Sequence, residues 1–151
     1  MRVVLDTNVL VSALLVGGSA GTAPRRVLRL CLNGRAVPLM GAALYAEYED
    51  VLSRRELFAR SPLSPTQREA VFDALMSACL WTPVYNLWRP NLPDAGDDHL
   101  VELALAGGAM WIVTANVRDL GQGELRFDNL EIGTAGEFLD RYDDPDQETI
   151  L

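Results

Sequence analysis

Four acidic side chains occupy positions where a carboxylate can do chemistry. Asp6 directly follows a short apolar run, Val3-Val4-Leu5, and Asp119 lies in the loop after a second predicted strand. Asp97 opens one segment with helical apolar spacing, and Glu47 lies inside another. Separate acids that converge in a fold repel one another unless cations neutralise their charge. A cluster of these carboxylates would hold Mg²⁺, which can activate a water and stabilise the charge that builds on a phosphate during hydrolysis.

The chain offers few other metal ligands. His99 is the only histidine, and the two cysteines, Cys31 and Cys79, lie 48 residues apart (79 − 31) in apolar helical patterns. We expect two buried free thiols rather than a disulfide or a metal pair. A zinc site built on several His and Cys ligands is excluded, and so is a Ser–His pair built away from His99. A bound metal would have oxygen ligands, which favours Mg²⁺ or Mn²⁺.

Strands and helices alternate along the chain. Short apolar runs predict strands at residues 2–5, 36–40, 82–85, 110–113 and 130–132. Apolar residues at helical spacing predict helices at about residues 9–15, 24–32, 42–52, 66–80, 97–106 and 135–139. This alternation predicts an α/β fold, a three-layer α/β/α sandwich with a mostly parallel central sheet. Open sheets of this kind bind ligands beyond the carboxyl ends of their strands, at the switch in strand order.

Each acid also has a purely structural explanation. Asp6 can cap the following helix, and Asp97 and Asp98 carry negative charge that suits a helix N-terminus. Glu47 can be a solvated helix residue, although its place next to Tyr48 puts it at the edge of the expected buried face. An acid directly after a buried strand lies where ligands bind, so the position of Asp6 favours a functional role. Taken singly, Glu47 and Asp98 favour the structural explanation, and Asp97 fits both equally.

The charge of the chain is negative and uneven. The net charge is −8, from 21 acids and 13 bases, and every base is an arginine. Residues 94–151 hold 14 acids and 3 arginines, whereas residues 1–73 hold 7 acids and 9 arginines. This balance counts against a protein that binds nucleic acid by charge alone. It is compatible with a metal-bridged nuclease, because each bound Mg²⁺ adds two positive charges where the phosphate must lie.

The length of 151 residues, 49% of them apolar, suits one domain. We expect this domain over residues 1–140 and a frayed acidic tail over residues 141–151. The apolar stretches are too short to span a bilayer, and the N-terminus reaches an acid too early for a signal peptide. We therefore expect a cytoplasmic protein that makes no membrane contact.

Four segments, in order along the chain, resemble the motifs of PIN-domain proteins, in the group described as toxin components of toxin–antitoxin systems. They are Val3 to Leu10 with its Asp-Thr-Asn, Leu44 to Leu52, Pro93 to Ala106, and Ile112 to Leu120. The resemblance covers Arg2 to about Leu139. Asp-Thr-Asn alone is weak evidence, but four motifs in order at suitable separations are strong evidence.

The resemblance implies a central parallel sheet flanked by helices and Mg²⁺- or Mn²⁺-dependent cleavage of RNA. It matches Asp6, Glu47 and Asp97 to metal-binding acids. Asp97 is preferred over Asp98, because Ala104 then falls where the family has its small helix residue. Further positions follow in the same way: Asp94 and Asp98 are second-line acids, and Asn8 and Thr114 would orient carboxylates or waters.

Asn116 departs from the family pattern, because many relatives carry Asp there. A neutral amide weakens a cation site. Asp119, three residues further on, is the other candidate, since Asn followed by Arg-Asp resembles a subgroup pattern. The fourth ligand, and with it a second metal, stays open between Asn116 and Asp119.

The resulting hypothesis is a ribonuclease with one or two Mg²⁺ ions held by Asp6, Glu47, Asp97 and either Asp119 or Asn116. A water activated by the ions attacks the phosphodiester in line and leaves 5′-phosphate and 3′-hydroxyl ends. Five arginines could guide the RNA backbone, although a solvated helix charge is the commoner role: Arg25, Arg26, Arg54, Arg55 and Arg118. As a toxin, the protein would form a homodimer and bind a small antitoxin protein through an apolar groove near the active site.

Three other functions remain open. A catalytically degenerate PIN-like module that binds RNA or a protein partner is favoured by Asn116 and the acidic surface, and opposed by the intact acids. An Asp-based phosphotransferase usually has a second Asp two positions after the first, where this chain has Asn8. A nucleotide-binding loop at residues 17–21 follows a helix rather than a strand, and the chain has no Gly-Lys-Ser/Thr.

Overall fold

The computed structural model describes residues 1–15, 22–84, 98–117 and 129–142 of the chain. Within them, one sheet contains five parallel strands, in the order β3-β2-β1-β4-β5. The strands are β1 (Arg2–Leu5), β2 (Val37–Met40), β3 (Leu80–Trp81), β4 (Trp111–Val113) and β5 (Glu131–Gly133). The chain passes from the central strand β1 to β2 and β3 on one side, and then to β4 and β5 on the other. The strand order therefore switches beside β1, which is where sheets of this type bind ligands.

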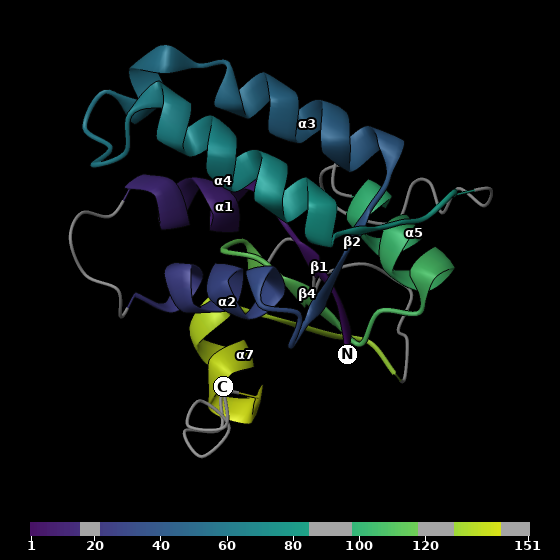
Figure 1. Cartoon of the computed structure of the whole chain (residues 1–151). Coiled ribbons are helices and arrows are strands. Elements are labelled where there is room, and N and C mark those ends of the chain that lie inside the picture. The colour runs from purple at the N-terminus through teal and green to yellow at the C-terminus, as the bar shows by residue number, and fades with distance from the viewer. Residues whose placement is uncertain (16–21, 85–97, 118–128, 143–151) are drawn as a thin grey trace.

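Helices cover both faces of this sheet (Figure 1). They are α1 (Thr7–Leu15), α2 (Ala23–Leu32), α3 (Ala42–Leu52), α4 (Pro65–Ala78), α5 (Asp98–Gly107) and α7 (Ala135–Tyr142), with a 3₁₀ helix η1 (Arg55–Phe58). Helix α5 packs against β1, β2 and β4, whereas α1, α2 and α7 pack side by side on the other face. The predicted three-layer α/β/α sandwich is confirmed. Helix α3 contacts both α1 and α5, so it bridges the two helical layers at one end of the sheet.

The central strands form the middle of the core. Val3 and Val4 of β1, and Ile112 and Val113 of β4, are fully buried. Burial on both faces is expected of a parallel sheet covered by two helical layers. The two strands pair in register, with Leu5 opposite Val113. The residues that directly follow these two strands therefore emerge side by side at the same edge of the sheet.

One stretch of the predicted elements is wrong. The apolar pattern predicted a helix to residue 80 and a strand at 82–85, but α4 ends at Ala78 and the strand β3 is Leu80–Trp81. Cys79 already has an extended backbone (φ −74°, ψ 146°), and β3 then pairs with β2. Leu80 and Trp81 continue the apolar spacing of the helix in sequence. They lie instead on the edge strand, where they are 41% and 51% exposed.

The two cysteines are free, as predicted, and Cys31 is fully buried whereas Cys79 is half-buried. Burial raises the pKa of both thiols to about 12. Thiols with such a pKa stay protonated at neutral pH and are weak nucleophiles.

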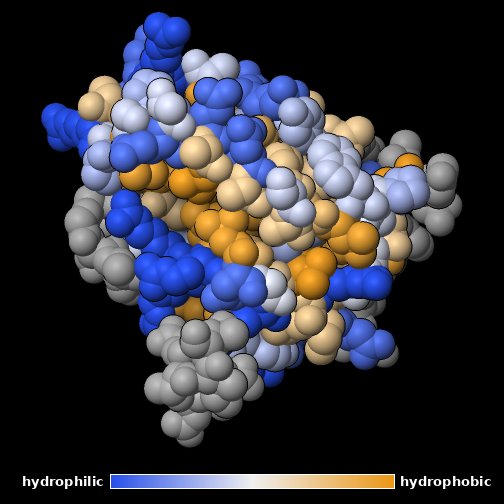
Figure 2. Space-filling view, in the orientation of Figure 1, coloured by the Kyte–Doolittle hydropathy of each residue, from blue (hydrophilic) through white to orange (hydrophobic). Residues whose placement is uncertain are grey.

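Apolar residues reach the surface in a band between α2 and α4, with hydrophilic residues around it (Figure 2). Leu32, at the end of α2, is 38% exposed. Exposed apolar surface that is rimmed by polar residues is typical of contact sites for other proteins. Among the described residues, no helix is both long and apolar enough to cross a membrane.

Candidate active site

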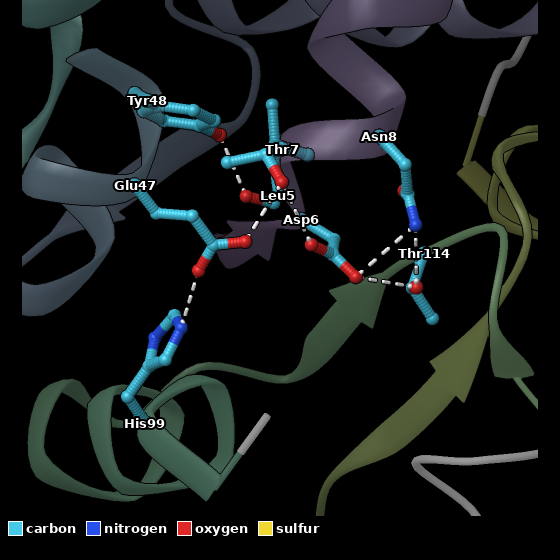
Figure 3. A network of polar contacts seen from close by, with 8 residues as sticks. All are labelled: Leu5, Asp6, Thr7, Asn8, Glu47, Tyr48, His99 and Thr114. Carbon is cyan, nitrogen blue, oxygen red and sulfur yellow. Dashed lines mark hydrogen bonds and ion pairs between the residues drawn. The ribbon is translucent and has the colours of Figure 1, made fainter. Parts of the chain in front are cut away.

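Side chains from three neighbouring strand–helix connections meet at the carboxyl ends of the central strands (Figure 3). Asp6 follows β1, and its backbone N–H donates to Val113 O at 2.9 Å. Thr114 follows β4, and Glu47 lies on α3, which follows β2. The three strands are adjacent and parallel, so the sheet itself brings these residues to one place.

Asp6 is a buried carboxylate, 5% exposed, that is held by side chains from α1 and from the loop after β4. Its Oδ2 accepts a hydrogen bond from Thr114 Oγ1 at 2.8 Å and another from Asn8 Nδ2 at 3.2 Å. The Thr114 hydroxyl also accepts from Asn116 N at 3.0 Å, which leaves its own proton for Asp6. Asn8 Oδ1 accepts from Ala115 N at 3.1 Å. Asn8 and Thr114 thus lie where they can orient the Asp6 carboxylate.

Thr7 bridges the two carboxylates. Its Oγ1 lies 3.3 Å from Asp6 Oδ1 and 3.0 Å from Glu47 Oε1. A hydroxyl has one proton, so it can donate to only one of these oxygens at a time. Whichever of Asp6 Oδ1 and Glu47 Oε1 does not receive the Thr7 proton lies near the other carboxylate without this hydrogen bond. A cation between the two carboxylates would reduce their repulsion.

The raised pKa of Asp6 also indicates that its negative charge is unfavourable without a cation. Its pKa is raised above the ordinary value of 3.8, chiefly because burial disfavours the charged form, while the hydrogen bond from Thr114 opposes the shift. The negative charge of Glu47 raises the pKa of Asp6 further. The fold therefore pays a free-energy cost to keep two carboxylates together, and such pairs are found where charge is needed for function.

The position of Glu47 is fixed by its neighbour in the helix. Tyr48 is buried, and its hydroxyl donates to Leu5 O at 2.6 Å. This bond ties α3 to the last residue of β1, directly before Asp6. The Glu47 side chain lies at the edge of the buried face, as predicted, and is 38% exposed.

His99, in the first turn of α5, lies against the far side of Glu47. Its Nε2 is 2.6 Å from Glu47 Oε2, and its side chain is only 10% exposed. The sequence marked His99 only as the single histidine. Its place directly after Asp97 and Asp98, at a helix start, was the available signal for a role near the acids.

Comparison with known protein families identifies the family of this chain. Residues 2–118 match the model of the PIN domain family. The chain belongs to the PIN domain family. PIN domains are generally nucleases. Among curated proteins, none matches this PIN chain significantly.

A solved structure shares the PIN fold. It is VapBC2 from Rickettsia felis bound to a DNA fragment from their promoter, with a TM-score of 0.55 and 16% sequence identity. The match covers 87% of this chain and 97% of that chain. At this identity the likeness establishes the common architecture.

The structure does not test the other site residues predicted from the PIN motifs. Asp98 begins α5, and its side chain is not described. The side chain of Asn116 is exposed, and its backbone N–H donates a hydrogen bond to the Thr114 hydroxyl. Several predicted residues lie outside the described part of the chain: Asp94, Asp97, Arg118 and Asp119.

Two of the arginines predicted to guide RNA form contacts with other groups of the chain. Arg25 Nε donates to Ala13 O at 2.8 Å, about 9 Å along α1 from Thr7 by helical rise. Arg54 pairs with Asp50 at 2.7 Å, near the far end of α3, and both side chains are largely exposed. Arg26 is half-buried on α2, and Arg55 is exposed on η1. A role for these arginines in RNA binding stays a prediction.

The donor set of the PIN site suits a hard divalent cation, because it consists of carboxylate, amide and hydroxyl oxygens. Within the described residues, no group of three or more His, Cys, Asp or Glu side chains is placed to hold a metal ion. A cation held by Asp6 and Glu47 would therefore need further ligands from outside the described residues or from water, and Asp97 directly precedes α5 in the sequence.

A separate groove of about 880 Å³ lies between α3, η1 and α4. Its walls include Leu52, Phe58 and Phe72 together with charged residues, and none of the side chains that surround Asp6 lines it.

Proposed function

We propose that this PIN-domain protein is a Mg²⁺- or Mn²⁺-dependent endoribonuclease that hydrolyses RNA phosphodiester bonds. The observation that carries the proposal is the carboxylate pair Asp6 and Glu47, bridged by Thr7 at the switch in strand order. Paired carboxylates at this position are costly in the metal-free protein, and a divalent cation offsets that cost.

Asp6 and Glu47 would hold the cation, with Asp97 and either Asp119 or Asn116 as further proposed ligands. When bound, the cation supplies water activation and stabilisation of the charge that builds on the phosphate. The hydrogen bonds from Thr114 and Asn8 keep Asp6 Oδ2 in one orientation, and Asp6 as a whole is buried. The expected products carry 5′-phosphate and 3′-hydroxyl ends.

The proposal extends to partners. The resemblance to toxin components, and a fold shared with VapBC2 bound to a fragment of its promoter, support a toxin that is neutralised by a small antitoxin protein. The apolar band between α2 and α4 supplies surface of the kind that such a protein would cover (Figure 2). A homodimer and a cytoplasmic location belong to the same proposal.

One observation favours a second candidate, a PIN module that binds RNA or a protein without cutting. Asn116 offers a neutral amide where many relatives carry an acid, and its side chain is exposed. Metal-independent RNA binding by a folded wild-type protein, without cleavage, would support this candidate over the nuclease.

A cleavage assay on a mixed RNA pool tests the proposed function. We expect wild-type protein to cut RNA with Mg²⁺ or Mn²⁺ and EDTA to abolish cleavage. Glu47→Gln should lower the rate by more than about 100-fold, since even residues that only support metal ligands cost 10- to 100-fold.

Glu49→Gln is the matched control, because Glu49 is an exposed acid two residues further along α3. It should cleave like wild type. Cleavage that persists in EDTA would contradict the metal mechanism, and equal rates for Glu47→Gln and wild type would contradict the site.

A further inference from the structure

We propose that His99 is a positioning residue, which fixes the Glu47 carboxylate for cation binding by tying it to the first turn of α5. This inference rests on the proposed function, because it concerns the same cation site. It assigns a role to a side chain that is not an acid and that would not touch the cation.

The contact between His99 and Glu47 is short and sheltered. The Nε2–Oε2 distance is 2.6 Å, and the imidazole is 10% exposed. A carboxylate can only accept hydrogen bonds, so Nε2 carries the proton and donates it to Glu47. Charge-assisted bonds of this kind are stronger than neutral ones and hold both partners in place.

Glu47 is held from two sides as a result. Thr7, at the start of α1, contacts Oε1, and His99, on α5, contacts Oε2 (Figure 3). A half-exposed glutamate on a helix otherwise loses rotamer entropy, at a cost in free energy, when it becomes ordered. These two contacts order the carboxylate before any cation arrives, so binding would not carry that cost.

The contact also joins two of the acidic motifs. Helix α5 begins at Asp98, directly after Asp97, and His99 is the next residue along the chain. Helices α3 and α5 are in contact. The His99–Glu47 bond therefore anchors the start of α5 to the helix that carries Glu47.

The second ring nitrogen of His99, Nδ1, argues against a role in core packing alone. Nδ1 is buried, and no described residue forms a hydrogen bond with it. An unsatisfied buried polar atom is unfavourable, whereas a leucine at this place would leave none. The bond to Glu47 is the interaction that offsets this cost, which points to a role in placing Glu47 rather than in packing.

Titration of Mn²⁺ by isothermal calorimetry tests the inference with intact protein. We expect His99→Leu to weaken Mn²⁺ binding by about 10- to 100-fold, the usual effect of losing a residue that supports a metal ligand. His99→Gln should restore most of the affinity, because its Nε2–H can reach the same carboxylate oxygen.

Ser61→Ala is the control for a general loss of stability. It removes the bond from Ser61 Oγ to Leu14 O (2.6 Å), which lies far along α1 from Thr7, and should leave Mn²⁺ affinity unchanged. A purely structural role for His99 would lower the melting temperature of the two His99 variants and leave their Mn²⁺ affinity at the wild-type value. That result would overturn the inference.

Melting temperatures in EDTA separate this inference from the proposed function. If wild-type protein binds no Mn²⁺, the proposed function fails. A double-mutant cycle of His99→Leu and Glu47→Gln in EDTA then still tests the contact. Non-additive shifts in melting temperature would show that His99 holds Glu47, and additive shifts would overturn the inference.

Discussion

Asp6 has lost most of its contact with water and stands beside a second carboxylate. Burial is the main cause of its raised pKa, the Thr114 hydrogen bond opposes it, and the charge of Glu47 adds to it. A pKa that is higher in the folded than in the unfolded chain means that the ionised carboxylate destabilises the metal-free fold. A cation bound beside Asp6 would therefore reduce the electrostatic cost of its charge.

Asp6→Asn should raise the free energy of unfolding of the metal-free protein at neutral pH, since the amide keeps the shape and removes the charge. Protonated Asp6 stabilises the fold fully below pH 3.8, the ordinary pKa that applies to the unfolded chain. This stabilisation is lost as the pH rises through the higher pKa of Asp6 in the folded protein. The advantage of the variant should therefore shrink as the pH falls from neutrality toward 3.8.

Urea unfolding of both proteins in EDTA, at several values between about pH 4 and pH 7, measures this difference. A variant that is less stable than wild type at pH 7 would show that the charge on Asp6 is well satisfied without a cation.

At the scale of elements, α5 lies close against the sheet because it ends in a glycine. A Cβ atom on Gly107 would lie 2.3 Å from Leu39 Cδ1 and 3.1 Å from Cδ2, and Leu39 is in the core. This close approach sets the depth of the helix whose first turn carries His99.

Gly107→Ala should destabilise the fold by about 1–3 kcal/mol, the usual cost of adding a methyl group to a packed core. Gly136→Ala in α7 is the control, because the nearest atom to its Cβ would be Thr134 Oγ1 at 3.9 Å. That change should be neutral or stabilise by up to about 1 kcal/mol, as alanine favours helix. Urea unfolding compares the two, and equal stabilities would contradict the close packing of α5.

Elements with strong local signals could be predicted from the sequence. The β-branched run of β1 and the apolar face of α3 gave strands and helices where the structure has them. The edge strand β3 could not be predicted, because Leu80 and Trp81 continue the spacing of α4 and only their pairing with β2 makes them a strand.

The acids of the site were predictable from motif and position, but their contacts were not. Thr7 and Glu47 are 40 residues apart in sequence, and Glu47 and His99 are 52 apart. Contacts at such separations depend on strand order, which no local pattern contains. Asp6 and Glu47 could therefore be predicted as candidates from the sequence, but the contacts of Glu47 with Thr7 and His99 could not.

At the scale of the whole molecule, the charge raises the question of how this protein could approach RNA. The net charge is −8, and the acids outnumber the arginines 14 to 3 after residue 93. Electrostatic attraction to phosphate is the main source of non-specific nucleic-acid affinity. A divalent cation bound at the strand ends would neutralise the charges of Asp6 and Glu47, so on the proposed function cation binding should come before productive RNA binding.

The measurement that tests this account most directly is calorimetric titration of Mn²⁺ into wild-type protein and Asp6→Asn. The account predicts binding to wild type and a loss of binding in Asp6→Asn, although the variant is at least as stable without metal. Equal affinity in the two proteins would contradict the claim that the carboxylates at the end of β1 form the cation site.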